Sequence, residues 1–200
     1  MSRLRVYHRV GAGRPIRVVW ALEEVGADYE LVTMSAEQAR GAEHRARHPL
    51  GRVPALEDDQ GPLIESTALV FHVAELYPDA GLLPAPATHE RAVVQGWSIF
   101  AMTELESPAI ESYRQRETNP EASTKAAARC ADAVAALEGA LSGTPPYLAG
   151  SRFTVADIVA GGVLDVAVRV GAIEPSPRSA AYLESLAARP ARQRASSKLG

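Results

Sequence analysis

The pattern of apolar and polar residues predicts a mixed α/β unit in the N-terminal part of the chain. Apolar and basic residues alternate from position 4 onward, as in a strand with one buried face. Gly11 and Gly13 end this alternation, and Pro15 then stands where the first turn of a helix tolerates proline. The apolar face that follows runs down to Gly26, a helix stop signal. The predicted elements are strand 4–10, helix 15–26, strand 29–33, a polar helix 35–48, strands 53–57 and 62–64, and helix 66–77.

Beyond residue 88 the pattern is helical. Proline and glycine gather between residues 78 and 88, which indicates a linker. Thr154 and Asp157 form a variant capping box at the start of one of the later helices. The predicted helices are 88–113, 120–141, 154–171 and 179–189, with a loop at 142–146. Two domains follow from this division, residues 1–80 and residues 88–200, joined by a linker at 81–87.

Composition and charge are those of a soluble globular protein. Hydrophobic residues make up 46% and charged residues 22% of the 200 residues, close to the globular average. The net charge is −3 and the arginines are scattered among acids, so nothing suggests a nucleic-acid partner. No apolar run approaches the ~20 residues of a membrane span, and the N-terminus lacks a signal-peptide core. The single cysteine, Cys130, leaves no disulfide framework and no CxxC redox pair. We expect a cytoplasmic protein without nucleic-acid or membrane partners.

Two short motifs carry candidate chemistry. An X-Pro bond such as Val53-Pro54 takes the cis form at a cost of roughly 0.5–1 kcal/mol. This dipeptide fits either an ordinary trans turn or a cis turn that directs the N–H and C=O of Val53 outward, toward an extended peptide. Glu65-Ser66 opens a helical pattern, and serine is a favoured first residue of helices. The same pair also offers a carboxylate for an ammonium group, and a hydroxyl with helix N-terminal amides for a carboxylate.

These motifs resemble the signature of the glutathione S-transferases. The string HPLGRVPALE at residues 48–57, followed by IESTALVFHVAELYP at residues 64–78, is similar to that of the family's N-terminal domain. Weaker similarities to other family segments occur at residues 17–24, 153–158 and 188–191. The resemblance implies an α/β thioredoxin-like N-terminal domain with an all-α C-terminal domain.

The same resemblance implies a function. Glutathione would be the co-substrate, bound without any metal and attacking a small hydrophobic electrophile or a peroxide held by the helical domain. The Val53-Pro54 bond would be cis and would pair with the peptide backbone of glutathione. Glu65 and Ser66 would hold its γ-glutamyl head, and Arg52 would meet its glycine carboxylate. The family also implies a homodimer.

The group that activates the thiol is left open by the sequence. The resemblance implies a Tyr, Ser or Cys near the end of the first strand, but no Ser, Thr or Cys lies between Tyr7 and Trp20. The candidates are Tyr7, His8 and the backbone amides at Gly13 and Arg14, with the Arg14 charge and the helix N-terminus lowering the thiol pKa. Strand alternation places the side chains of Tyr7 and His8 on opposite faces.

Two function classes compete at this point. The leading hypothesis is a glutathione transferase that binds glutathione and activates its thiol. The alternative is a non-catalytic glutathione-binding or interaction protein of the same fold, which the missing hydroxyl favours. A thiol-disulfide oxidoreductase is disfavoured because the N-terminal domain has no cysteine that forms a mixed disulfide.

Overall fold

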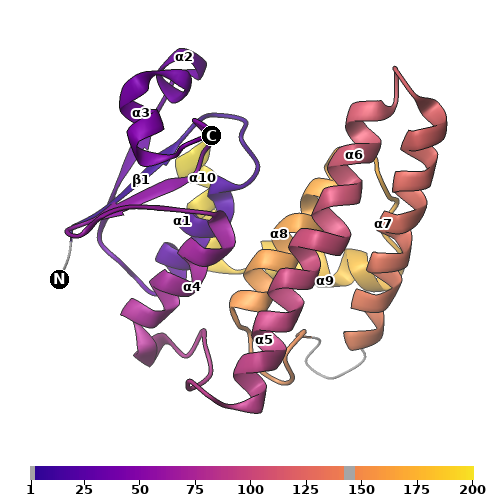
Figure 1. Ribbon diagram of the computed structural model, residues 1–200. Helices are drawn as coiled ribbons and strands as arrows, with labels where there is room; N and C mark the ends of the chain where they lie inside the picture. The colour runs from indigo at the N-terminus through magenta and orange to yellow at the C-terminus, as the bar shows by residue number, and fades with distance from the viewer. Residues whose placement is uncertain (1–2, 142–146) are drawn as a thin grey trace. The chain divides into compact units, whose positions relative to one another are not determined.

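The computed structural model describes residues 3–141 and 147–200, and the predicted loop at 142–146 lies outside them. The chain divides into two compact units (Figure 1). Unit 1 comprises Met1–Gly81 with Arg189–Gly200, and unit 2 comprises Leu82–Ala188. No helix among the described residues is both long enough and apolar enough to cross a membrane.

Unit 1 is built on a four-stranded sheet in the order β2-β1-β3-β4. The β1 and β2 strands are parallel, whereas β1 pairs with β3, and β3 with β4, in antiparallel fashion. A parallel pair needs a crossover connection, and helix α1 supplies it. This arrangement confirms the thioredoxin-like fold that the sequence resemblance implied. The elements are β1 Leu4–His8, α1 Pro15–Glu24, β2 Tyr29–Thr33, β3 Ala55–Asp58, β4 Gly61–Ile64, α4 Ser66–Leu76 and the short 3₁₀ helix η1 Pro78–Ala80.

The two faces of strand β1 have different neighbours. Leu4 and Val6 are buried on one face, and the paired residue of Leu4 on β2, Tyr29, donates a hydrogen bond from its hydroxyl to Glu23 of α1. The core of unit 1 therefore lies between this face and α1, which packs in turn against α4. Arg5 points to the opposite face.

The polar segment predicted as one helix, 35–48, forms two. Helix α2 spans Ala36–Arg40 and helix α3 spans Ala42–Arg47. Gly41 separates them because its backbone is extended, with φ −68° and ψ 161°. Ser35 and Gln38 form a capping box at the start of α2. The side chain of each accepts a hydrogen bond from the backbone N–H of the other. The sequence analysis did not identify this box.

Unit 2 is helical in its described part, as predicted. Its central helix is α8, which is buried along most of its length and begins at the predicted capping box of Thr154 and Asp157. Asp157 accepts hydrogen bonds from the backbone N–H of Thr154 and Leu148 and from the hydroxyl of Tyr182. The elements are α5 His89–Phe100, η2 Ala101–Glu106, α6 Ser107–Gln115, α7 Pro120–Ala140, α8 Val155–Arg169 and α9 Pro177–Ala187.

The long helix predicted at 88–113 is interrupted by a π-helical segment, η2. Pro108 explains its place, because proline lacks an N–H and its ring clashes with the carbonyl four residues earlier, here Glu104. The helix widens in the turn before the proline and returns to α-helical geometry in α6.

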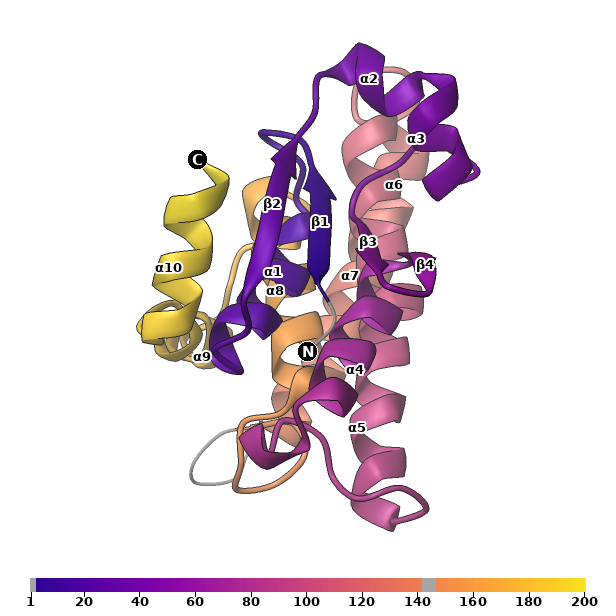
Figure 2. The same ribbon diagram turned by 90° about the vertical axis from the view of Figure 1, so that its left-hand side faces the viewer.

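The C-terminus differs from the predicted division. Instead of ending before Pro190, the chain forms a further helix, α10 Pro190–Leu199, which packs on α1 and belongs to unit 1 (Figure 2). Pro190 is its first residue, a position where proline is favoured. Ala191 and Ala195 are buried on its inner face. The helical domain therefore ends at residue 188 and not at residue 200.

Ion pairs hold α10 on α1. Glu24 pairs with Arg189 at 2.6 Å, and Glu23 pairs with Arg194 at 2.7 Å and with Lys198 at 2.6 Å. Burial of Glu23 acts to raise its pKa, but the hydrogen bonds from Lys198, Tyr29 and Arg194 outweigh it and lower the pKa to about 2. The carboxylate is thus charged at neutral pH and ties the two helices together.

Candidate functional site

The Val53-Pro54 peptide bond is cis, which confirms the prediction. Pro54 is buried and Val53 half-buried, and strand β3 begins at the next residue, Ala55. No hydrogen bond within the described residues takes the backbone N–H or C=O of Val53. Both groups are therefore available to an extended peptide.

The segment before Val53 is fixed by close backbone packing. Gly51 has φ +59°, in the region that favours glycine, and a Cβ atom there would lie 2.6 Å from the carbonyl oxygen of Ala39 in α2. Only glycine fits this approach without displacing the backbone. Arg52 follows with an exposed side chain, and its carbonyl accepts a hydrogen bond from His44 of α3 at 2.8 Å.

Glu65 and Ser66 stand at the start of α4, and the backbone of Glu65 has an unusual conformation. Glu65 has φ 68° and ψ 107°, which is rare for a residue other than glycine and is seen most often at functional sites. Its side chain is exposed and caps no backbone N–H of α4. The carboxylate and the uncapped amides of the first turn therefore remain available for ligand charges of opposite sign.

The β3–β4 hairpin brings the two motifs together. Ala55 pairs with Ile64, so the antiparallel register places the residues that precede Ala55 beside those that follow Ile64. The peptide edge at Val53 and the charged clamp at Glu65 consequently lie at the same end of the sheet. The sequence contained both motifs, and the strand register makes them neighbours.

Arg17 is a further candidate site residue, which the sequence analysis missed. It lies on α1, is fully buried, and its Nη1 is 3.4 Å from the hydroxyl oxygen of Ser66, which is 2% exposed. A guanidinium this deep in the domain adds positive charge beneath the start of α4. The available signal was an arginine set among the apolar residues of the first helix.

The side chains of Tyr7 and His8 lie on opposite faces of the sheet, as strand alternation predicted. The Tyr7 hydroxyl donates a hydrogen bond of 2.6 Å to Glu57, and the guanidinium of Arg47 lies 4.3 Å from its ring centre. Burial raises the pKa of the Tyr7 phenol, and the hydrogen bond to Glu57 raises it further. The Tyr7 proton is therefore engaged on the side of the sheet that α3 covers.

His8 faces the side of the sheet that α1 covers. Its Nε2 is 2.8 Å from the hydroxyl of Thr33, its Nδ1 has no partner among the described residues, and the side chain is buried. Burial lowers the pKa of His8, so that its imidazole is neutral at pH 7.

The start of α1 provides the other candidates for contact with a thiol. Gly13 precedes Arg14, which is the N-cap residue of α1 and makes no side-chain cap to the helix. The helix dipole and the uncapped amides of this first turn favour negative charge.

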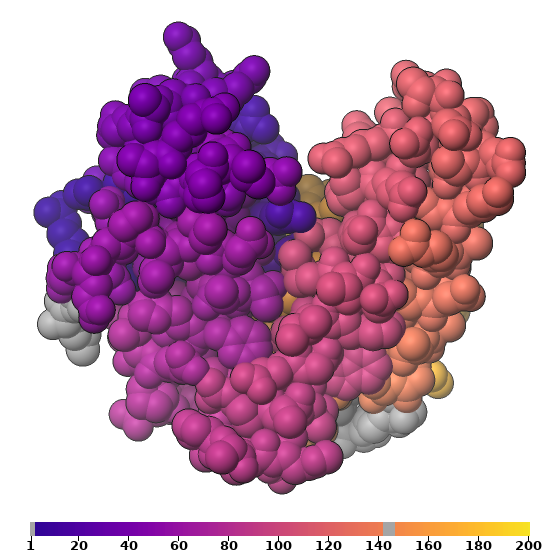
Figure 3. Space-filling model, in the orientation of Figure 1, coloured from indigo at the N-terminus to yellow at the C-terminus, as the bar shows by residue number. Residues whose placement is uncertain are grey.

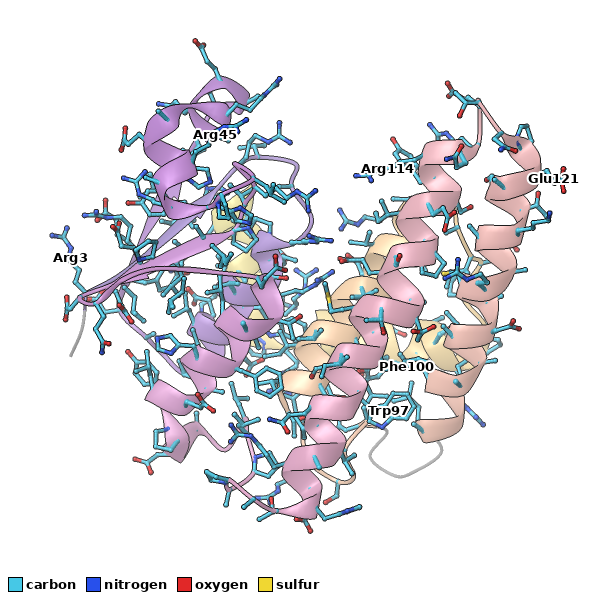
Figure 4. All side chains as sticks on the ribbon, in the orientation of Figure 1. Arg3, Arg45, Trp97, Phe100, Arg114 and Glu121 are labelled. Atoms are coloured by element: carbon cyan, nitrogen blue, oxygen red, sulfur yellow. The ribbon has the colours of Figure 1, made fainter. Side chains whose placement is uncertain are left out.

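Unit 2 presents aromatic side chains along the α5–η2–α6 run. Trp97 and Phe100 pack edge to face with ring centres 5.3 Å apart (Figure 4). Ile99 and Tyr113 are 60% and 42% exposed. The space-filling view shows the surface of this helical run (Figure 3). The Trp97–Phe100 pair and the exposed Ile99 and Tyr113 are the apolar side chains that this run offers to a hydrophobic molecule.

Comparison with known proteins gives consistent matches over both units. The family model for the glutathione S-transferase N-terminal domain matches residues 2–75, and that for the C-terminal domain matches residues 108–185. Glutathione S-transferase 4 of Zea mays is 33% identical over 188 residues, which cover 88% of this chain and 83% of that protein.

Solved structures agree. A glutathione transferase from Methylococcus capsulatus str. Bath has a TM-score of 0.88 at 30% identity, with 98% of each chain covered. BphK, a bacterial GST solved as a ternary complex, has a TM-score of 0.88 at 28% identity and covers 98% of this chain and 99% of its own.

Proposed function

The chain belongs to the glutathione S-transferase family, and we propose that it binds glutathione along the edge formed by Arg52, Val53, Pro54, Glu65 and Ser66. The observation that carries this assignment is the hairpin register, which sets the unpaired backbone of Val53 beside the clamp at Glu65. Glutathione is an extended peptide with a zwitterionic γ-glutamyl head. Its binding therefore requires a backbone edge, as at Val53, next to charged groups for the head, as at Glu65.

Each group of the proposed site has a distinct task. The N–H and C=O of Val53 pair with the cysteinyl backbone of glutathione, as a strand pairs with a sheet edge. Glu65 accepts from the γ-glutamyl ammonium, while the Ser66 hydroxyl and the first amides of α4 donate to its carboxylate. Arg52 meets the glycine carboxylate at the other end.

Calorimetry with glutathione tests this site. Ser66→Ala removes a charge-assisted hydrogen bond and should weaken binding by about 1.5–3 kcal/mol. Ser98→Ala, which deletes a buried hydroxyl in unit 2 that bonds Val94, is the matched control and should leave the affinity unchanged. An affinity that Ser66→Ala does not alter would place the head group elsewhere.

For thiol activation we propose the start of α1. The backbone amides near Gly13 and Arg14, with the charge of Arg14, stabilise the thiolate, and Tyr7 and His8 are the side-chain alternatives. A pKa decrease of one unit requires only about 1.4 kcal/mol of differential stabilisation. An amide pair with a nearby cation is sufficient to supply it.

Titration of the thiolate absorbance of bound glutathione distinguishes these groups. Arg14→Ala should raise the bound-thiol pKa by about one unit, whereas Arg9→Ala, an exposed arginine of the preceding turn, should not. Tyr7→Phe should leave the pKa nearly unchanged, since the Tyr7 hydroxyl is engaged with Glu57. A return to the pKa of free glutathione in Tyr7→Phe alone would make this a tyrosine-type enzyme.

The second substrate is a small hydrophobic electrophile or a peroxide, which the aromatic surface around Trp97 and Phe100 would hold. Conjugation of glutathione to a generic aryl halide is the direct assay. Retention on a glutathione column without turnover would support the non-catalytic alternative.

The active form is a homodimer, and a monomeric mass by light scattering at micromolar concentration would contradict this.

A further inference from the structure

Two buried imidazoles hold the segment that leads to Val53. His44 of α3 is fully buried, and His48, the residue that ends α3, is 5% exposed. The Nε2 of His44 is 2.8 Å from the carbonyl oxygen of Arg52. The backbone N–H of Leu50 donates to Nδ1 of His48 at 3.2 Å. We call residues 48–52 the binding loop.

The hydrogen-bond partners fix the protonation of both rings. A carbonyl oxygen only accepts, so Nε2 of His44 carries a proton. A backbone N–H only donates, so Nδ1 of His48 carries a lone pair and no proton. The loop therefore has its observed geometry only while His48 is unprotonated at Nδ1. A second proton on His48 would set the Nδ1–H and the Leu50 N–H, two donors, against each other at a ring that is 5% exposed.

The binding loop is too tight to absorb the loss of this contact. The backbone N–H of His48 donates to His44, and that of Gly51 donates to the carbonyl of His48 at 2.7 Å. The backbone of Gly51 also packs closely against Ala39 of α2. These contacts fix the chain on both sides of Leu50. A shift at Leu50 is thus transmitted to the peptide edge.

The charged and titratable groups around the pair come from several elements. The carboxylate of Glu65, at the start of α4, and the guanidinium of Arg52 both act on His48, as does His44. The Tyr7 ring of β1 lies 6.0 Å from the ring of His44. Burial lowers the pKa of His48, and the negative charge of Glu65 opposes this only in part.

We propose that His44 and His48 are positioning residues for the glutathione-binding edge, and that protonation of His48 in mild acid releases the binding loop and weakens glutathione binding. The proposal rests on the site assigned above. A base with a lowered pKa stabilises the folded arrangement fully above its ordinary pKa of about 6.5 and less as the pH falls below it. Affinity should therefore be full near neutrality and decline in acid.

Two substitutions separate hydrogen bonding from titration. In His48→Asn the amide oxygen occupies nearly the place of Nδ1 and accepts from the Leu50 N–H, but it does not titrate. His48→Ala removes the acceptor. For His44, glutamine retains a donor near the Nε2 position, and His44→Ala removes it. His89→Asn, at an exposed histidine of α5, is the control.

The probe is S-methylglutathione, whose blocked sulfur removes thiol ionisation from the measurement. We expect its affinity for the unaltered protein to fall about three- to tenfold between about pH 7.5 and about pH 5.5, the effect of one hydrogen bond. His48→Asn should bind nearly independently of pH, His48→Ala weakly at both values, and His44→Gln more tightly than His44→Ala. The His89→Asn protein should retain the full pH dependence.

The proposal is overturned if His48→Asn keeps the acid sensitivity or if His48→Ala binds as tightly as the unaltered protein at pH 7.5. If the proposed glutathione site itself is wrong, the result differs, since neither the unaltered protein nor any of the variants would then bind S-methylglutathione. In that case the amide NMR signal of Leu50 decides the remaining question. It should shift as His48 titrates and should stay constant in His48→Asn.

Discussion

At the scale of single residues, the candidate site depends on backbone geometry as much as on side chains. Val53 offers its N–H and C=O, and Glu65 combines a positive φ with an exposed side chain. The sequence predicted these residues because the strings around them resemble the family signature, whereas each motif alone also fits an ordinary turn or helix start. It did not predict Arg17 or His48, because their roles depend on contacts that only the fold creates.

Gly51 is a single residue whose replacement should move the peptide edge. In Gly51→Ala the new Cβ would meet the Ala39 carbonyl at 2.6 Å, and the left-handed conformation adds about 1–2 kcal/mol of strain. Calorimetry should show glutathione affinity about tenfold weaker, because relief of the close contact with Ala39 displaces the backbone that leads to Val53.

Gly81→Ala is the matched control for this test. Gly81 also has a positive φ, +66°, but a Cβ there meets nothing within 4 Å. It should therefore lose a similar amount of stability in denaturant and retain its affinity. Equal affinity losses in both variants would show that the close contact with α2 does not position the loop.

At the scale of elements, the capping box of α8 shows which contacts of a helix can be predicted from the local sequence. Thr154 and Asp157 were recognisable because a capping box occupies four consecutive residues. The bonds from Leu148 and Tyr182 to Asp157 were not, because they come from other elements.

Asp157→Ala would leave these buried donors without an acceptor and should lower the free energy of unfolding by about 2–4 kcal/mol. Denaturant unfolding followed by Trp97 fluorescence in a Trp20→Phe background measures this. Asp132→Ala, at an exposed position of α7, should cost less than about 0.5 kcal/mol. A comparable loss in both variants would argue against the role of the box.

Helix α10 is an element that the pattern of apolar and polar residues did not predict. Proline both ends helices and begins them, so Pro190 alone did not decide between the two. The buried residues of α10 are alanines, Ala191 and Ala195, which are too small to produce a strong apolar periodicity. The helix is held instead by its cations, whose partners lie in α1.

The attachment of α10 should depend on pH through Glu23. Its pKa of about 2 in the folded protein lies below its ordinary value, so its stabilising contribution is present above about pH 4.5 and is lost as the pH falls toward 2. The full shift corresponds to about 3 kcal/mol, and screening of the half-exposed Arg194 and Lys198 leaves about 1–2 kcal/mol.

Denaturant unfolding of unit 1 at several acidic pH values measures this contribution. Glu23→Gln should remove that part of the pH dependence, whereas Glu43→Gln, an exposed carboxylate of α3, should leave it in place. An unchanged pH profile in Glu23→Gln would mean that the ion pairs contribute nothing to the attachment.

At the scale of the whole molecule, the chain carries one tryptophan in each unit, Trp20 and Trp97. Trp20 lies on α1, where it donates to Glu24 and where Arg192 of α10 lies 5.6 Å from its ring centre. In a Trp97→Phe background the fluorescence therefore reports on unit 1 and on the docking of α10.

Deletion of residues 190–200 should destabilise unit 1 although the cut lies at the far end of the chain. The loss of two ion pairs with a buried carboxylate, and of the contacts of Ala191 and Ala195, should cost at least about 2 kcal/mol. The Trp20 transition should move to lower denaturant, whereas Trp97, observed in a Trp20→Phe background, should change little. Equal shifts of both transitions would indicate that α10 supports the whole chain.

The pairing of α1 with α10 also sets the order in which the protein can be completed during synthesis. Glu23 and Glu24 leave the ribosome early, yet their partners Arg189, Arg194 and Lys198 follow 165, 171 and 175 residues later. Nascent domains generally fold in the order of their synthesis. Here the acidic pair on α1 lacks its cationic partners throughout translation of the second unit, and unit 1 becomes complete only after α10 has emerged.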